Sequence, residues 1–352
     1  MGRLTGKWQL LILCGIALTA LCLPAHAAPL DPYIEGAKKE GSVKLGLTIR
    51  AKSHGKPAGE LYIAAFQKRY PFLKVNFKRI GGARERERII VEMASGMIDY
   101  DVATVSETMI PTIMNAKLPR IVEWEKLGIP KFFIHPKNVG LSMRTPIYGI
   151  AYNRNLVPDA VAKTFTWETC TDPKWKGKVT LNERPRYMEH LYQDDVWGRA
   201  KTLDYAKRLA ANKPVFNASQ SDATEKVNSG SHPMMCGIAR GQVKDIQLNT
   251  GTKALGIVYP EPVLVGVGDL IYVPDKAKHP NAAILFMVWQ SSLEGQKFLE
   301  DTDYTGEPRV EGLNIKADFQ GRKAVYSTWQ DQANADAHLT DILQAMGMPV
   351  VR

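Results

Sequence analysis

Hydrophobic and polar positions follow two alternating patterns along the first third of the chain. Short apolar runs at residues 42–49, 73–80 and 101–105 have the length and composition of strands. Between them, apolar positions recur with helical spacing at residues 59–70 and 84–95. Strands that alternate with helices are typical of sheets with parallel neighbours, so this region predicts an α/β fold.

The rest of the chain repeats this alternation after a proline- and lysine-rich passage at residues 130–146. Four more segments are predicted as strands and four as helices. The strands are expected at 147–153, 234–239, 254–259 and 263–273, and the helices at 187–209, 223–228, 280–299 and 331–346. The sequence contains no internal repeat and no low-complexity tract.

The first 27 residues have the pattern of a cleavable secretion signal. Arg3 and Lys7 precede an almost entirely apolar, uncharged run at residues 8–23, and residues 25–27 place small side chains at the two positions that signal peptidase reads. The run is short for a membrane-spanning helix, although an uncleaved N-terminal anchor is the alternative. Each cysteine in this segment follows a leucine, where a lipoprotein signal has a small residue. We therefore expect residues 1–27 to be removed and the protein to be released into the periplasm of a Gram-negative bacterium.

Composition and charge describe an ordinary globular protein with a basic balance. Hydrophobic residues make up 45% of the chain and charged residues 23%, and 46 lysines and arginines against 36 acidic residues give a formal net charge of +10 at pH 7. The basic residues are spread out, without the runs or interleaved aromatic residues that are typical of nucleic-acid binding, so no nucleic-acid partner is expected. The basic excess is either an ordinary solvated surface or a cleft that attracts an anion.

Two cysteines, Cys170 and Cys236, lie beyond the secretion signal. An exported protein meets an oxidising compartment, so a disulfide between them is one interpretation. Two buried thiols or a metal-binding pair are the alternatives. The metal pair is disfavoured because no histidine or further cysteine stands at ligand spacing from either residue.

Five segments carry a resemblance to a known family. They read EGAKKEG at 35–41, AAFQKRYP at 64–71 and IYGIAYN at 147–153, then a tryptophan followed by DPKWKGK within 167–178, and a late helix from HPNAA to SLEGQ within 279–296. In this order they resemble the family 1 extracellular solute-binding proteins of bacterial ABC importers, near the branch of ferric-ion-binding proteins. The resemblance covers nearly the whole chain after the secretion signal.

This resemblance implies a two-lobed fold, the type II periplasmic-binding-protein fold. Each α/β lobe surrounds a mixed sheet, and two crossing strands form a hinge between the lobes. The first lobe would comprise residues 28–135 and 266–303, and the second residues 136–265 and 304–352. A small molecule would bind in the cleft between the lobes, draw them together, and pass to an ABC permease and ATPase complex at the inner membrane. Such a protein performs no chemistry, needs no cofactor or resident metal, and works as a monomer.

The ligand of such a fold binds near the carboxyl ends of strands and at helix N-termini, where free backbone N–H groups face the cleft. Four loops after expected strands and several helix entries fit this description. The candidate ligand-binding residues are Thr48, Arg50, Ser53, Gly82, Arg84, Ser106, Arg184, Ser219 and Arg240. A single loop arginine is usually a solvated surface charge, but arginines from four loops that converge on one cleft suit a carboxylate or phosphate. We therefore predict a small organic anion as the solute.

Ferric iron is the alternative solute. The ferric-binding branch coordinates the metal mainly through two adjacent tyrosines after the strand that corresponds to residues 234–239. Here residues 237–241 read GIARG and contain no tyrosine, and an arginine would repel a hard cation that needs anionic oxygen ligands. Possible iron ligands elsewhere are His54, Glu107 and Tyr148, but these residues match no known metal-binding motif. A further alternative is a sensor of the same fold that presents its ligand to a membrane receptor.

An enzyme is the remaining class. Ser106, His190 and Asp194 could form a catalytic triad, but His190 and Asp194 stand four residues apart on an expected helix, which is typical of a surface pair. The chain has neither a G-x-S-x-G nor an H-E-x-x-H motif. We therefore expect no catalytic residues.

Overall fold

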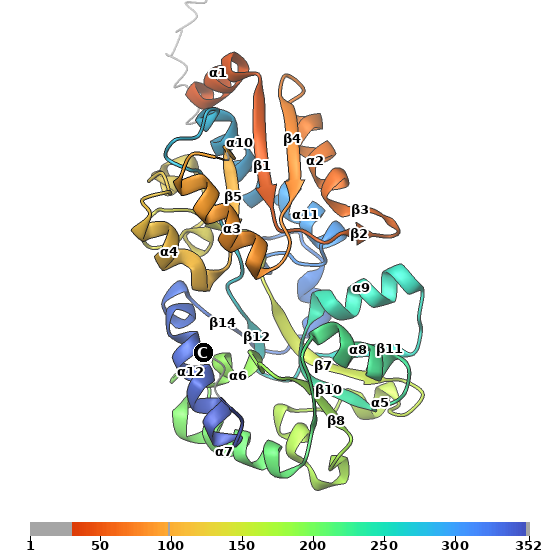
Figure 1. Cartoon of the computed structure of the whole chain (residues 1–352). Coiled ribbons are helices and arrows are strands. Elements are labelled where there is room, and N and C mark those ends of the chain that lie inside the picture. Colours follow the sequence, from red (N-terminus) through yellow and green to blue (C-terminus); the bar gives the residue numbers. More distant parts are fainter. Residues whose placement is uncertain (1–29, 98, 350–352) are drawn as a thin grey trace, which may run out of the picture.

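A computed structural model describes residues 30–97 and 99–349 of the chain. The expected secretion signal at residues 1–27 lies outside the described residues. Within the described ranges, no helix combines the length and the apolar character that crossing a membrane requires. These residues form two lobes, one above the other in Figure 1, and each is built around its own β-sheet.

The sheet of the first lobe has five strands in the order β4-β1-β5-β13-β6. β1 runs parallel to β4 and β5, whereas β13 runs antiparallel to β5 and β6, so the sheet is mixed. A short hairpin, β2-β3, follows β1. The strands are β1 (Ser42–Leu47), β2 (Lys52–Ser53), β3 (Lys56–Pro57), β4 (Lys74–Arg79), β5 (Val102–Val105), β6 (Leu141–Ser142) and β13 (Leu270–Tyr272).

The sheet of the second lobe has seven strands around a central β7. β7 is antiparallel to β10, β11 and β12, whereas β8 is parallel to β9 and β10, so this sheet is also mixed. All seven residues of β7 are buried, which explains its continuous apolar run. The strands are β7 (Ile147–Asn153), β8 (Val179–Asn182), β9 (Val215–Asn217), β10 (Met234–Ala239), β11 (Leu255–Val258), β12 (Val263–Val265) and β14 (Ala324–Tyr326).

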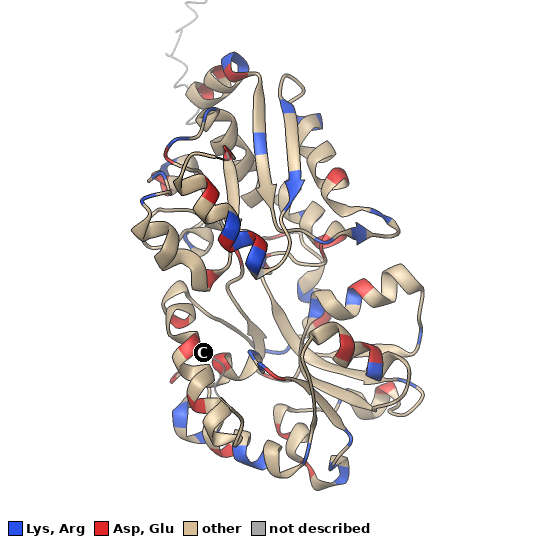
Figure 2. Cartoon of the chain, in the orientation of Figure 1, with Lys and Arg blue, Asp and Glu red and all other residues tan. Residues whose placement is uncertain are grey.

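Helices cover the sheets of both lobes (Figure 1). The first lobe carries α1 (Asp31–Glu40), α2 (Ala58–Arg69), α3 (Ala83–Ala94), α4 (Ile110–Asn115), α10 (Pro280–Ser291) and α11 (Leu293–Thr302). The second carries α5 (Asp159–Ala162), α6 (Tyr187–Leu191), α7 (Gly198–Ala211), α8 (Gln220–Asn228), α9 (Arg240–Thr250) and α12 (Trp329–Ala345). Short 3₁₀ turns are η1 (Glu107–Met109), η2 (Trp124–Leu127), η3 (Lys131–Phe133), η4 (Trp167–Thr171), η5 (Pro173–Trp175) and η6 (Ile315–Phe319). Basic and acidic residues are interspersed over both lobes (Figure 2).

Each lobe has its own hydrophobic core. In the first, the Phe66 ring meets the Phe286 ring of α10 edge-on, with centroids 5.1 Å apart. α10 is apolar on nearly every side, and nearly all of its side chains are buried. In the second core, Trp167 stacks on Tyr187 with centroids 5.1 Å apart. The two main cores are therefore separate, although Trp329 at the start of α12 packs into a further apolar cluster of the first lobe.

Cys170 and Cys236 are bonded to each other, with their Cα atoms 6.3 Å apart. The bond joins η4 to β10 within the second lobe, and both side chains are buried in its core. The sequence left a disulfide, two buried thiols and a metal-binding pair open, and the structure confirms the disulfide.

Two segments cross between the lobes side by side. The chain leaves the first sheet at β6 and enters the second at β7 through residues 143–146, and it returns between β12 and β13 through residues 266–269. We call these the crossing segments. The Gly266 N–H donates a hydrogen bond of 2.8 Å to the Pro146 carbonyl oxygen, which holds the two segments together. A third connection, residues 303–314, follows α11.

The structure moves one expected lobe boundary. β6 pairs with β13 in the first sheet, so residues 136–142, expected in the second lobe, lie with the first. The predicted boundary lies too early because the proline-rich passage was interpreted as the linker between the lobes. The chain crosses to the second lobe through the four residues that follow β6.

Three predicted segments are each divided in two. Residues 263–273, expected as one β-rich run, form β12 and β13 in different sheets because the chain crosses between the lobes there. Residues 280–299 divide at Ser292, whose Oγ accepts a hydrogen bond from the Gly295 N–H at 3.3 Å and so begins α11. Residues 187–209 form α6 and α7 rather than one helix.

Candidate ligand-binding cleft

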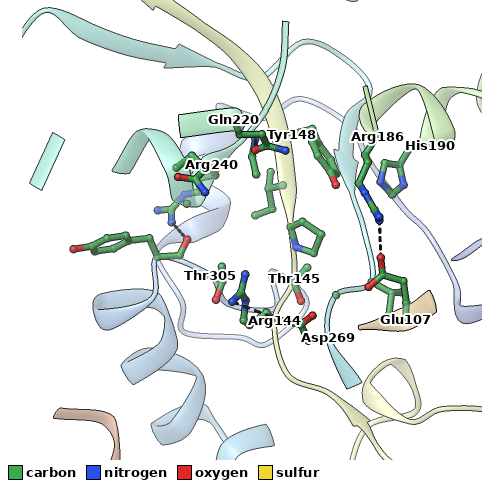
Figure 3. A pocket seen from close by; sticks show the side chains of 18 of the residues that line it. Glu107, Arg144, Thr145, Tyr148, Arg186, His190, Gln220, Arg240, Asp269 and Thr305 are labelled. Carbon is green, nitrogen blue, oxygen red and sulfur yellow. Dashed lines mark hydrogen bonds and ion pairs between the residues drawn. The ribbon is translucent and has the colours of Figure 1, made fainter. Parts of the chain in front are cut away.

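A cavity of about 430 Å³ lies between the lobes, beside the crossing segments. Side chains from both lobes and from the crossing segments surround it (Figure 3), and we call it the inner cavity. A second cavity of about 660 Å³, the outer cavity, adjoins it. Arg50, Arg144, Ser221 and Gln242 line both, so the cleft is continuous and strongly polar.

Two helices of the second lobe begin at the inner cavity. α8 is capped by Ser219, whose Oγ accepts a hydrogen bond from the Asp222 N–H at 3.0 Å. α9 begins at Arg240 directly after β10, and its N-cap residue, Ala239, offers no side-chain hydrogen bond. The first residues of both helices line the cavity. Because N-terminal N–H groups lack partners within the helix and carry partial positive charge, this side of the cavity favours an anion.

Two of the arginines at the inner cavity are held by the protein itself. Arg240 donates from Nε to Asp318 at 2.8 Å and from Nη1 to the Tyr304 carbonyl oxygen at 2.7 Å. Arg50 donates from Nε to the Asp303 carbonyl oxygen at 2.9 Å. These contacts fix both guanidinium groups and use part of their donor capacity.

Arg144 lies on the first crossing segment, and its side-chain contacts with the described residues are long. Its guanidinium is 3.4 Å from a carboxylate oxygen of Asp303, 3.7 Å from one of Asp269 and 3.5 Å from the Thr48 carbonyl oxygen. Burial works against its charge, but Asp303, Asp269 and Glu107 together raise its pKa, so the group stays protonated. Arg144 is therefore a charged donor group that has capacity left for a ligand.

Arg186 and Glu107 meet at a part of the inner cavity away from Arg240 and Gln220 (Figure 3). Arg186 of the second lobe donates from Nη1 to Glu107 of the first lobe at 2.6 Å. Glu189 also lines the cavity; it is 5% exposed, and its Oε1 has no hydrogen-bond partner among the described residues. Burial raises the pKa of Glu189 to about 8, against the opposing effect of Arg186.

Two neutral rings complete this part of the wall. The rings of His190 and Tyr148 lie with their centroids 5.0 Å apart. Burial lowers the pKa of His190 to about 4, and its Nδ1 lies 2.5 Å from Ser327 Oγ; burial also raises the pKa of Tyr148. Within the described ranges, no hydrogen bond joins His190 to Ser106 or Asp194, so these three residues do not form a triad.

Four of the nine candidate residues from the sequence line the cleft. Arg50, Ser219 and Arg240 line the inner cavity, and Thr48 lines the outer cavity. Thr48 and Arg50 follow β1, Arg240 follows β10, and Ser219 caps α8. They occupy strand ends and a helix start, where the fold places ligand contacts.

The other five candidates are not among the residues that line either cavity. Ser53 is fully buried, and its Oγ lies 3.1 Å from the Tyr304 hydroxyl. Ser106 Oγ lies 3.1 Å from Thr108 Oγ1, while the next residue, Glu107, lines the cavity. The remaining three, exposed around the starts of α3 and α6, are Gly82, Arg84 and Arg184.

Sequence reasoning missed several lining residues. Arg144 and Asp269 lie on the crossing segments, whose pairing no local pattern reveals. Near α6 the chain turns at Asn182, whose Oδ1 accepts a hydrogen bond from the Arg184 N–H at 3.0 Å, and Arg186 lines the cavity instead of Arg184. The sequence shows that Arg184 and Arg186 precede α6, but it does not show which of the two faces the cavity.

The conceivable iron ligands are not gathered at one point. Glu107 and Tyr148 line the inner cavity, but His54 does not, and its Nδ1 lies 3.1 Å from Ser53 Oγ. In the part of the chain that the structure describes, no group of three or more histidine, cysteine or acidic side chains could hold a metal ion.

Comparison with known proteins identifies both a family and a fold. A family model described as bacterial extracellular solute-binding protein matches residues 62–337, and comparison with curated protein sequences gives no match. Ferric iron-binding protein A of Mannheimia haemolytica, in an open conformation, aligns with a TM-score of 0.68 and 17% identity over 87% of this chain and 98% of that one.

Two further solved structures show the range of proteins with this fold. Iron-bound HitA of Pseudomonas aeruginosa aligns with a TM-score of 0.64 and 18% identity over 86% of this chain and 99% of that one. The spermidine/putrescine-binding protein PotD of Streptococcus pneumoniae aligns with a TM-score of 0.58 and 15% identity over 87% and 99%. At such identities the likeness concerns the fold alone, and it confirms the two-lobed α/β architecture with two mixed sheets that the sequence predicted.

Proposed function

Because the chain belongs to the bacterial extracellular solute-binding protein family, we propose that it captures a small organic anion between its lobes and delivers it to an ABC permease and ATPase complex. Members of this family bind solutes and are not enzymes. The protein acts in the periplasm, where the secretion signal expected at residues 1–27 would release it, and it works as a monomer.

The observation that carries this proposal is the position of Arg144. Its charged guanidinium lies on a crossing segment, lines both cavities and makes only contacts of 3.4 Å or longer. A planar guanidinium binds carboxylate or phosphate through paired hydrogen bonds. The starts of α8 and α9 supply further N–H groups from the second lobe.

This arrangement connects binding to closure. An anion on Arg144 would meet the helix starts of the second lobe from the hinge side, and its contacts would be complete only when the lobes approach each other. A ligand that binds the closed form better shifts the population toward it. The closed surface is then the form that the permease recognises.

Ferric iron is the second candidate because ferric-iron-binding proteins recur among the structures with this fold. Those comparisons favour iron over an organic anion as the solute. The cavity itself favours the anion, because its arginines oppose a trivalent cation and Glu107 is already bonded to Arg186. The two candidates therefore differ in a way that experiment can separate.

Substitution of Arg144 tests the proposal directly. Arg144→Gln should weaken the binding of an organic anion by about tenfold to a hundredfold, since it removes a charged hydrogen-bond donor. Arg184→Gln removes an equal charge from an exposed residue outside both cavities and should change the affinity little. Equal affinities for the Arg144 variant and the wild type would remove Arg144 from the site.

The identity of the solute can be read from freshly purified protein. Native mass spectrometry should show a small organic molecule, and a thermal-shift screen of carboxylates, phosphates and ferric citrate should show stabilisation by organic anions alone. Purified protein that carries visible ferric iron, or that only ferric citrate stabilises, would contradict the organic-anion proposal and support iron.

A further inference from the structure

Two groups of charged side chains line the inner cavity. Arg144 and the starts of α8 and α9 form one side. Asp269 lies there too, 3.7 Å from Arg144, but it accepts a hydrogen bond from Arg86 at 3.0 Å, so the Arg144 donors stay available to an anion. Glu107, Arg186 and Glu189, together with the Tyr148 hydroxyl group, form what we call the acidic end. Figure 3 shows Arg186 and Glu107 grouped at a distance from Gln220 and Arg240. The acidic end contains two carboxyl groups for one arginine.

Glu189 is the group at the acidic end that the protein leaves without a partner. Its side chain is 5% exposed, and Oε1 accepts no hydrogen bond from the described residues. Arg186 lies nearby but donates to Glu107 instead. A buried polar oxygen without a partner destabilises the folded state, so the position is costly for a purely structural side chain.

Glu189 lines the inner cavity, so a ligand there can donate to its carboxyl group. The cavity of about 430 Å³ is of a size for a small molecule that reaches from Arg144 to Glu189, since both residues line it. The arginine side accepts the anionic group of such a molecule, and the carboxyl side accepts a cationic donor. A hydroxyl group could also donate to this carboxyl group, but only a cation also favours its ionised form.

We propose that the solute is a zwitterion, whose carboxylate or phosphate is held by Arg144 and whose ammonium group donates to Glu189. This inference rests on the proposed function and narrows its substrate class to amino acids, amine-bearing phosphates and similar compounds. Glu189 thereby selects among anions that Arg144 alone would not distinguish.

Protonation of Glu189 gives the proposal a second, independent readout. Burial raises the pKa of Glu189 to about 8; Arg186 and Arg184 act to lower it, and Glu107 and Asp336 act to raise it further. With these protein groups alone around it, the group is therefore protonated near pH 7. An ammonium ion favours the carboxylate and lowers this pKa, so binding of a zwitterion should release a proton. Neutral His190 and the Tyr148 hydroxyl group, which share this wall, do not take it up.

Matched pairs of ligands test the ammonium site. β-Alanine is compared with propionate, and phosphoethanolamine with ethyl phosphate, by isothermal titration calorimetry in buffers of different ionisation enthalpy. We expect one amine-bearing compound to bind at least about tenfold more tightly than its partner, the effect of one charged hydrogen bond, with release of a proton.

Two variants assign that preference to its residue. Glu189→Gln keeps the shape and neutrality of the protonated side chain, so it should fold normally and lose both the preference and the proton release. Glu183→Gln, at an exposed residue outside both cavities, should keep both. A melting temperature near that of the wild type shows that each variant is folded.

The outcomes separate this inference from the proposed function. Equal binding of both members of each pair, or a preference that persists in Glu189→Gln, overturns the ammonium site and leaves the capture of organic anions intact. Failure of all four probes to bind overturns the ammonium site too. If ferric citrate alone then stabilises the protein, the organic-anion proposal fails with it.

Discussion

Arg240 lies in the wall of the inner cavity, 8% exposed, with its guanidinium group between Asp318 and the Tyr304 carbonyl oxygen. These partners belong to η6 and to the connection that follows α11, so the side chain ties the start of α9 to the last part of the chain. Lys244 is 3.9 Å from the same carboxylate oxygen of Asp318. A ligand would therefore meet a guanidinium group whose main contribution is to the fold.

Replacement of Arg240 by alanine should accordingly lower the free energy of unfolding. The change leaves the buried Tyr304 carbonyl oxygen without this donor, which costs about 1–3 kcal/mol. Urea denaturation measures the loss. Lys244→Ala, which removes only a 3.9 Å contact to the same Asp318, should change stability much less. Equal losses in the two variants would contradict this structural role of Arg240.

Stability should also fall as the pH is lowered from about 6.5, the ordinary pKa of histidine, toward 4. Burial lowers the pKa of His190 to about 4 in the folded protein, and burial does the same for His135. In this window the unfolded chain binds protons at both histidines that the folded chain does not, which outweighs the one proton that folded Glu189 retains, so stability rises with pH. Urea denaturation as a function of pH measures the slope, and His190→Gln should reduce it. A slope that the substitution leaves unchanged would show that other groups set the pH dependence.

At the scale of elements, strands were predicted correctly from the sequence where an apolar run is also a buried strand. The bounds of β7 and β10 equal those of the predicted runs at 147–153 and 234–239, because those runs are apolar and almost wholly buried. The run at 263–273 misled because it stays apolar and buried while it changes from one sheet to the other. α9 was missed because residues 240–250 contain only three large apolar side chains, Val243, Ile246 and Leu248, which form no continuous apolar face.

The same reasoning explains which parts of the site could be predicted. Thr48, Arg50 and Arg240, which line the candidate cleft, could be proposed because they follow strands whose ends were visible in the sequence. Arg144 was not, because its position depends on how two distant segments pair across the hinge. Glu189 looks like the exposed charge of an amphipathic helix, and only the packing of α6 against other elements of the second lobe buries it.

The two crossing segments approach each other so closely at Gly268 that a residue with a side chain does not fit there. A Cβ atom there would lie 2.0 Å from the Arg144 carbonyl oxygen, and backbone cannot move aside as a side chain can. Gly268→Ala should therefore push the segments apart, lower the melting temperature and weaken ligand binding together. In Gly82→Ala the added Cβ meets nothing within 4 Å, so both quantities should stay near wild type. Wild-type affinity in the Gly268 variant would contradict a tight hinge.

At the scale of the whole molecule, ion pairs join the lobes across the cleft. Arg186 of the second lobe bonds to Glu107 of the first at 2.6 Å, and Arg50 of the first lies 3.5 Å from Asp245 of the second. These contacts favour the approach of the lobes independently of any contact with a ligand. A ligand needs to add only part of the free energy of closure, because the pairs already supply a share of it.

Removal of the shorter pair should therefore open the unliganded protein. A partly exposed ion pair contributes about 1 kcal/mol, which is about a fivefold change in the ratio of closed to open molecules. Glu107→Gln should raise the radius of gyration measured by small-angle X-ray scattering at low salt, and added salt should reduce the difference from wild type because it screens the pair. Glu92→Gln breaks a contact with Arg88 inside α3 alone and should leave the radius unchanged. If both variants scatter like the wild type, the packing of the crossing segments, rather than the ion pairs, sets the separation of the lobes.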